Sequence, residues 1–357
     1  MIIMAIDLGK FKSMVCYYNK ETQEYFFETV VTQRAYFHTL LKHHSPDLVV
    51  VVEACGPSGW VGDVCEELGL NLIVCSTNED AWLFKNTKRK TDKDDALKLA
   101  RLAVMNELVP THVPSKTVRE KRRLIKFRKK IVQRINGVKC GIRSIFANQG
   151  MQISSGAQTW YSGRQFLIDN AKPLAQCEPE ELWRGELQLE LNQLDALEAQ
   201  LSTIEKRLDD IAKNDAQIQR VQTINGVGRV TAEAIVAYID DPHRFKSARQ
   251  VSAYAGLVPH QYQSGVTDRR GRITKRGPRL LRTLLVECAW CSLQYNQWSQ
   301  QTYDRIHANK QPRKKKAAVA VARKILVLAW AMMRDEVDYD PERNVETEHE
   351  KKNTLAA

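Results

Sequence analysis

A short, continuous apolar run at residues 47–52 constrains the fold of this chain more than any other feature. A run of this kind, with four valines in succession, is typical of a strand buried on both faces of a sheet. Strand-like runs precede it at 1–7, 13–18 and 25–31 and follow it at 71–75, while helical spacing occupies 35–44 and 58–68. The pattern predicts an α/β domain whose sheet has mixed direction, with a meander first and crossovers later.

The rest of the chain is mainly helical by pattern. Thr91 and Asp94 have the spacing of a capping box at the start of a helix, and residues 115–147 form a long basic helical stretch. Farther on, leucines recur every seven residues, with Leu197, Ile204 and Ile211 between them, at Leu187, Leu194, Leu201 and Leu208. This is the apolar seam of a coiled-coil-like helix, which serves either self-association or an antiparallel hairpin within the chain.

These patterns divide the chain into four segments. We expect an α/β domain with a basic C-terminal helix at 1–150, a linker with coiled-coil helices at 151–215, and a mainly α domain at 216–333. Residues 334–357 form an acidic tail that we predict to be disordered, because it offers little apolar surface to bury.

The charge of the chain is +12, and it is unevenly distributed. Residues 115–144 hold twelve Lys and Arg against one acid, residues 264–282 hold seven against one, and residues 310–324 hold seven against none. Three such clusters indicate a polyanionic partner, and nucleic acid is the first hypothesis. The alternative is that the clusters are solvated helix faces.

Other features exclude secreted and membrane classes. The chain has no N-terminal secretory pattern, and its apolar stretch at 317–333 contains Arg323 and Lys324, which a membrane span does not tolerate cheaply. The eight cysteines have no framework spacing, and the single CxxC pair (Cys288 and Cys291) has no second pair or histidine cluster nearby. We therefore predict buried thiols in a reducing cytoplasm, and no membrane association.

Four carboxylates stand where two strand ends and a helix start are predicted. Asp7 ends the first strand, Glu53 follows the buried strand, and Asp92 and Asp95 share a face of the capped helix. Hard oxygen donors of this kind suit Mg²⁺, as one or two ions, for phosphodiester chemistry. Each acid also has an ordinary structural explanation, because turns favour Asp and the first turn of a helix favours acids.

The order of these acids resembles the DEDD tetrad of bacterial insertion-sequence transposases, whose relatives include the Piv-type DNA invertases. The resemblance implies a RuvC-like N-terminal domain of ribonuclease-H type. It also selects Asp92 and Asp95 from the run Thr91-Asp92-Lys93-Asp94-Asp95-Ala96.

Two features near the C-terminus also concern nucleic acid. Residues 221–232 form a helix, a turn with Gly226 and Gly228, and a helix, which is the pattern of a helix-hairpin-helix that contacts phosphate through backbone N–H groups. Ser264 precedes Gly265 in a loop followed by clustered arginines. A Ser-Gly pair is more often just a turn, but the stretch 256–282 resembles the transposase domain of the same family, in which the serine at this position is the proposed nucleophile.

The resemblance implies an RNA-guided DNA recombinase that moves its own element. In this family metal-bound acids (Asp7, Glu53, Asp92 and Asp95) and a serine, here Ser264, form a composite site between protomers of a dimer or tetramer, and a non-coding RNA of the element pairs with the DNA. In a bacterium we expect such a protein in the cytoplasm, on the nucleoid when active. The residues expected to contact nucleic acid are Arg122, Arg123, Lys126, Lys129, Lys130, Gly226, Gly228, Arg269, Arg270, Arg272, Lys275, Arg276, Arg279, Lys314, Lys315 and Lys316.

Rival interpretations remain at this point. A RuvC-like junction nuclease would use the four acids with water as nucleophile, and a DNA invertase of the same family would share the serine chemistry. A non-catalytic binding protein on a decayed nuclease fold is a third. An actin-like ATPase or sugar kinase would need a second phosphate loop and a glycine-rich adenosine loop, neither of which the sequence contains.

Overall fold

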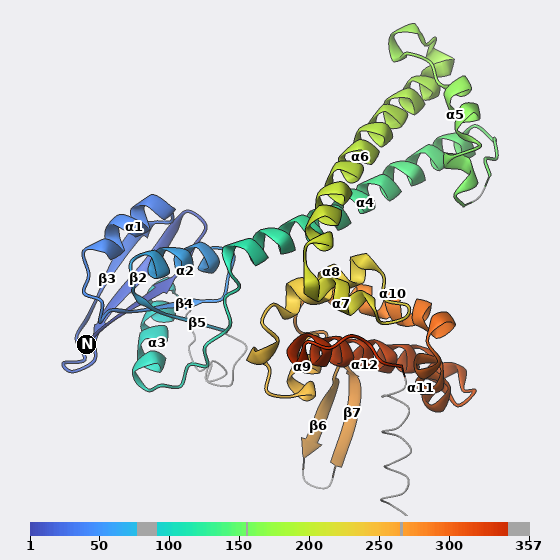
Figure 1. Cartoon of the computed structure of the whole chain (residues 1–357). Coiled ribbons are helices and arrows are strands. Elements are labelled where there is room, and N and C mark those ends of the chain that lie inside the picture. The colour runs from blue at the N-terminus through green and yellow to red at the C-terminus, as the bar shows by residue number, and fades with distance from the viewer. Residues whose placement is uncertain (77–90, 155, 265–266, 342–357) are drawn as a thin grey trace, which may run out of the picture. The chain divides into compact units, whose positions relative to one another are not determined.

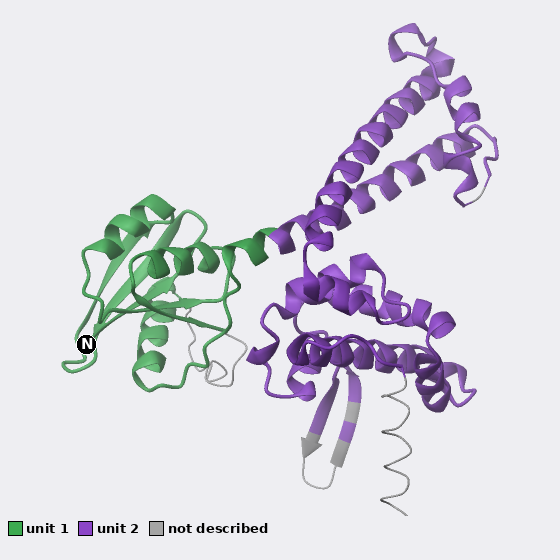
Figure 2. Cartoon of the chain, in the orientation of Figure 1, with its two compact units in different colours: residues 1–120 green, residues 121–357 purple. Residues whose placement is uncertain are grey.

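The computed structural model describes residues 1–76, 91–154, 156–264 and 267–341. The chain forms two compact units, residues 1–120 and 121–357 (Figure 2). Helix α4 (Lys116–Asn148) begins in the first unit and continues into the second. The division into four segments stays a prediction, and most of the predicted tail, residues 342–357, lies outside the described residues.

A five-stranded sheet forms the centre of the first unit, in the order β3-β2-β1-β4-β5. Its strands are β1 (Ile2–Asp7), β2 (Lys12–Asn19), β3 (Tyr25–Val31), β4 (Val49–Glu53) and β5 (Asn71–Cys75). Strands β1, β2 and β3 pair antiparallel as a meander, whereas β1, β4 and β5 are parallel. The predicted mixed sheet is therefore confirmed.

Helices cover both faces of this sheet (Figure 1). Met4, Ile6 and Val52 lie on the face that packs against α1 (Arg34–Lys42) and α2 (Ser58–Glu67). Ala5 and Val51 lie on the other face, against α3 (Asp92–Val104). Because side chains alternate along a strand, every residue of β1 and β4 is assigned to one face or the other.

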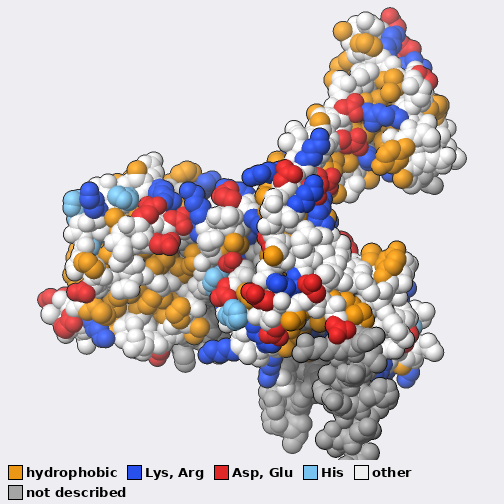
Figure 3. Space-filling model, viewed as in Figure 1, with side chains coloured by type: hydrophobic (Ala, Val, Ile, Leu, Met, Phe, Trp, Pro, Cys, Tyr) orange, Lys and Arg blue, Asp and Glu red, His pale blue; other side chains and the backbone are white. Residues whose placement is uncertain are grey.

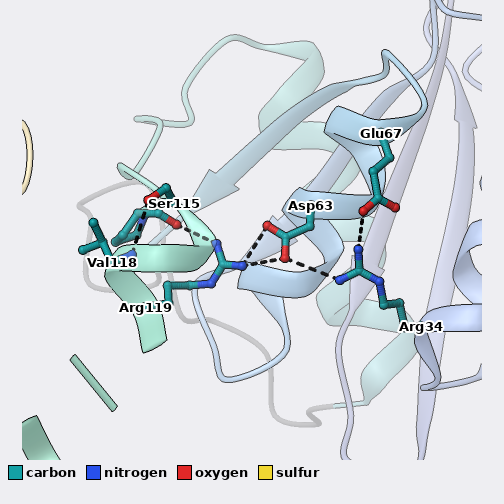
Figure 4. A network of polar contacts seen from close by, with 7 residues as sticks. Arg34, Asp63, Glu67, Ser115, Val118 and Arg119 are labelled. Carbon is teal, nitrogen blue, oxygen red and sulfur yellow. Dashed lines mark hydrogen bonds and ion pairs between the residues drawn. The ribbon is translucent and has the colours of Figure 1, made fainter. Parts of the chain in front are cut away.

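The first turn of α4 is fixed to α2 by an ion-pair network (Figure 4). Arg119 donates hydrogen bonds to both carboxylate oxygens of Asp63, at 2.7 and 2.6 Å, and to the carbonyl oxygen of Pro114 at 2.6 Å. Arg34 of α1 contacts the same Asp63 at 3.4 Å and Glu67 at 2.5 Å. Hydrogen bonds between charged groups are stronger than neutral ones, and Asp63 accepts them from both arginines, so α1, α2 and the start of α4 are held together.

In the second unit α4 and α6 (Leu182–Lys213) form an antiparallel arm, with α5 (Arg164–Asn170) at its far end (Figure 1). Leu187, Leu194 and Leu208 are buried among the isoleucines of α4. The ammonium of Lys139 lies 3.0 Å from the Glu198 carboxylate across the arm. The heptad seam is thus buried within one chain, which confirms the hairpin alternative.

The remaining helices share one core. They are α7 (Ala216–Gln222), α8 (Arg229–Ile239), α9 (Ala248–Tyr254), α10 (Arg279–Tyr295), α11 (Gln297–His307) and α12 (Lys314–Asp335). A two-stranded hairpin of β6 (Pro259–Ser264) and β7 (Thr267–Ile273) extends from this helical core (Figure 1). The sequence predicted that Ser264 lies in a loop, whereas the structure makes it the last residue of β6; Gly265 lies outside the described residues. None of the helices described is long and apolar enough to cross a membrane.

Candidate functional site

Two of the predicted acids end neighbouring parallel strands. Ile6 of β1 pairs with Val52 of β4, so Asp7 and Glu53 occupy the next position of each strand. Since Ile6 and Val52 belong to the face covered by α1 and α2, alternation places Asp7 and Glu53 on the α3 face. Both are half-buried.

The Cys55 thiol lies close enough to both acids for their charge to affect its pKa. Burial raises the pKa of Cys55, and the nearby carboxylates of Glu53 and Asp7 raise it further. Negative charge close to a thiol disfavours the thiolate, so both acids lie within electrostatic reach of one point just beyond β4. The sheet therefore brings these two predicted acids together.

Helix α3 positions the other two acids. Thr91 caps it, because its Oγ1 accepts a hydrogen bond from the backbone N–H of Asp94 at 3.2 Å and donates to the Asp94 carboxylate at 2.7 Å. The predicted cap is confirmed, and Asp94 is engaged in it. Asp92 and Asp95, one turn apart in α3, remain as candidates, with Asp92 exposed and Asp95 half-buried. Their helix packs on the face that Asp7 and Glu53 share.

The chemistry of these donors fits a hard divalent cation, since all four are carboxylates. Within the part of the chain that the structure describes, however, no three acidic, histidine or cysteine side chains lie close enough to hold one ion. The strand register brings Asp7 and Glu53 together. Asp92 and Asp95 lie on the helix that covers the same face of the sheet, but among the described residues they do not come close enough to share an ion with that pair. Like charges repel, so closing four carboxylates around one point requires positive charge between them.

Ser264 is the last residue of β6, and its backbone pairs with Thr267 of β7. Residues 265–266 and the side chain of Ser264 lie outside the described residues. The structure thus places Ser264 at the end of a hairpin rather than in an irregular loop. Short runs on both sides of a single glycine were the pattern that would have indicated this hairpin.

The predicted order of helix, glycine-containing turn and helix is confirmed by α7 and α8, and the phosphate contact of a helix-hairpin-helix stays a prediction. Gly226 has φ +90°, and a Cβ there would lie 2.6 Å from the Cα of Ser292, so α10 packs directly on the turn. Gly228 is the N-cap of α8, and no heavy atom lies within 4 Å of the position of a Cβ there. Gly228 is thus open at the N-terminus of α8, the end of a helix that attracts anions.

The basic residues of α4 have different environments. Arg122 donates to the carbonyl oxygens of Ala237 at 2.6 Å and Tyr238 at 3.1 Å, which fixes α4 to the end of α8. Arg128, which is not among the predicted nucleic-acid contacts, is buried and paired with Glu233 at 2.8 Å. Of the other α4 residues predicted to contact nucleic acid, Arg123, Lys126 and Lys130 are exposed and Lys129 is half-buried.

The two other basic clusters are mostly at the surface. Of the predicted nucleic-acid contacts in these clusters, the exposed side chains are those of Arg269, Arg272, Lys275, Arg276, Arg279, Lys314, Lys315 and Lys316, and the side chain of Arg270 lies outside the described residues. Lys314 also lies over the ring of Trp290, with its ammonium 5.6 Å from the ring centroid. On the face shown in Figure 3, by contrast, acids and bases alternate along the arm of α4 and α6.

Comparison with known proteins decides the family. A family model of DEDD transposases of the IS110 type matches residues 4–148, and the model of the IS116/IS110/IS902 transposase family matches residues 218–304. The chain belongs to this transposase family. The match covers both the carboxylate-bearing unit and the region of the serine hairpin.

Relatives of this IS110-family transposase align over most of its length. A probable family 20 transposase of Pseudomonas aeruginosa is 28% identical over 309 residues, which is 83% of this chain and 87% of the relative. The transposase for insertion sequence element IS1111A of Coxiella burnetii is 28% identical over 308 residues, 81% of this chain and 79% of the relative. A pilin gene-inverting protein of Moraxella lacunata is 29% identical over 119 residues, 33% of this chain and 37% of the relative.

Membership has direct consequences. The chain is a transposase and therefore acts on DNA, and its DEDD domain implies the use of a divalent metal. The mixed sheet with helices on both faces is the expected RuvC-like arrangement.

Proposed function

We propose that this transposase cleaves and joins DNA with Ser264 as nucleophile, while Asp7, Glu53, Asp92 and Asp95 hold Mg²⁺ at the scissile phosphate. The observation that carries the proposal is the β1–β4 register, which sets Asp7 and Glu53 side by side on the face of α3. A second support is that Ser264 is the last residue of β6, in a hairpin that extends from the helical core.

The chemistry of the proposed step is balanced without a further reactant. The Ser264 hydroxyl oxygen attacks phosphorus, a phosphoserine bond forms, and the bond from phosphorus to the 3′-oxygen breaks. The proton of the serine is transferred to the leaving 3′-oxygen, and the resulting 3′-hydroxyl later attacks the phosphoserine linkage of another strand. A bound divalent ion supplies positive charge that stabilises the attacking and leaving oxygens. Arg269 and Arg272, both exposed on β7, neutralise phosphate oxygens nearby.

Strand cleavage distinguishes this proposal from a junction nuclease. Replacing Asp7 by Asn removes cleavage in both cases, because both need the metal. Replacing Ser264 by Ala removes cleavage only if the serine attacks, since a nuclease uses water. Cleavage of element ends by the Ser264→Ala variant at the wild-type rate would contradict the proposal.

We also propose that a site forms between protomers of a dimer or tetramer. The heptad seam is buried against α4 of the same chain and does not support this proposal. Its support is that the four acids and the serine belong to different compact units. Mixing the inactive Asp7→Asn and Ser264→Ala variants tests it. Mixed oligomers then contain one intact composite site and regain cleavage, whereas a site built within one chain gives none.

A non-coding guide RNA is the partner we propose for part of the exposed basic surface. Arg123, Lys126 and Lys130 lie exposed along α4, a helix in which Glu120 is the one acid among many basic residues. Contacts of this kind give binding that falls steeply as salt rises. The protein purified at low salt should carry RNA that a ribonuclease releases, and an absorbance spectrum of bare protein would contradict RNA guidance.

A DNA invertase remains the second candidate. The similarity to a pilin gene-inverting protein supports shared chemistry, and the two functions differ in the ends that are joined. Sequencing the products formed from a plasmid with two element ends separates inversion from excision.

A further inference from the structure

Tyr262 is an aromatic residue of a strand whose side chain is largely exposed. It lies in β6, and 64% of its surface is accessible. Its partner across the hairpin is Arg269 of β7, whose side chain is also exposed. Directly opposite residues of an antiparallel pair project to the same face, so a flat ring and a guanidinium stand side by side on this hairpin.

Gly271 and His260 lie next to the Tyr262 ring and fix its position. A Cβ at Gly271 would lie 3.2 Å from Cε2 of Tyr262 and 3.5 Å from the Cβ of His260, so the absence of a side chain there lets both rings lie across β7. The two ring centroids are 6.2 Å apart, with an angle of 28° between the ring planes. The Tyr262 ring is therefore held in place while much of its surface stays in water.

We propose that Tyr262 is a stacking platform for an unpaired base of the DNA strand that is cut. Tyr262 precedes Ser264 by two residues, which is about 7 Å along a strand. A base stacked on Tyr262 thus places a phosphate of the same nucleotide or its neighbour near Ser264. Arg269 contributes a cation beside the ring for the adjoining phosphate, and aromatic rings stack on every base without reading its identity. This inference rests on the proposed role of Ser264.

A binding experiment with the Ser264→Ala protein isolates stacking from cleavage. The probe is a DNA duplex of an element end that is single-stranded around the cleavage site and carries 2-aminopurine next to it. Tyr262→Ala should weaken binding of this probe by about 5- to 150-fold and leave the 2-aminopurine fluorescence unquenched. Tyr262→Phe keeps the ring and should bind within threefold of the parent protein.

Tyr295→Ala provides the matched control, because Tyr295 is 67% exposed at the end of α10 and away from the hairpin. Unchanged binding and quenching in Tyr262→Ala would overturn the proposal, as would an equal loss in Tyr262→Phe, which would assign the effect to the hydroxyl. Cleavage by the Ser264→Ala protein would instead contradict the proposed nucleophile. The stacking measurement does not depend on that outcome, so the two failures are distinguishable.

Discussion

Replacing Glu233 by Gln should destabilise the second unit strongly. The Glu233 side chain is 1% exposed, and it accepts hydrogen bonds from Arg128 at 2.8 Å and from Arg229 at 3.2 Å. The Arg128 side chain is 6% exposed, so losing the carboxylate leaves a guanidinium buried without a counter-charge. Breaking a buried pair from one side costs about 3–5 kcal/mol. For a unit of this size that corresponds to a fall of about 6–20 °C in Tm.

Thermal unfolding followed by circular dichroism measures this effect, and two variants serve as controls. Glu198→Gln removes a carboxylate from the more exposed pair with Lys139 and should cost less than about 1 kcal/mol. The double change Arg128→Met with Glu233→Leu replaces the pair by apolar groups and should recover most of the lost stability. A Glu233→Gln variant no less stable than Glu198→Gln would refute the reasoning, as would a double variant that stays as unstable as the single one.

Three further outcomes test other parts of the structure. Burial raises the pKa of the Cys55 thiol, and the charge of Glu53 raises it further. Glu53→Gln should therefore lower that pKa and shift the pH dependence of Cys55 alkylation to lower pH. An unchanged pH profile would contradict the proximity of Glu53 to Cys55. Gly59→Ala should cost less than about 1 kcal/mol in urea unfolding, because a Cβ there would lie 2.8 Å from the flexible end of Arg119 and shift it in a partly exposed ion pair; a larger loss would show that the pair is held more rigidly. Leu194→Ala should cost about 2–5 kcal/mol without changing the sedimentation coefficient, and dissociation of an oligomer would show that the seam is intermolecular.

The first unit was predictable because its information is local. The continuous run of residues 49–52 requires a doubly covered strand, and alternation then fixes the faces of Asp7 and Glu53. The cap at Thr91 likewise depends on neighbours within four positions, and it distinguishes Asp94 from Asp92 and Asp95.

Long-range pairings were beyond the sequence. A heptad seam has the same pattern whether it packs against another chain or against a helix of its own chain. Only the structure shows that its partner is α4. Arg128 stands in a run of basic residues, and its counter-charge Glu233 is 105 positions away. The hairpin was missed because β6 and β7 are polar and two-stranded, without the apolar alternation that marks a strand packed on a core.

The most direct test of the central claim is the covalent state of Ser264 during the reaction. The protein is incubated with a nicked duplex of its element end and Mg²⁺, digested, and analysed by peptide mass spectrometry. We predict a nucleotide adduct on the peptide that contains Ser264, formed only with divalent metal and lost when Asp7 is replaced by Asn. Cleaved DNA without any protein adduct, or an adduct on another residue, would contradict the claim.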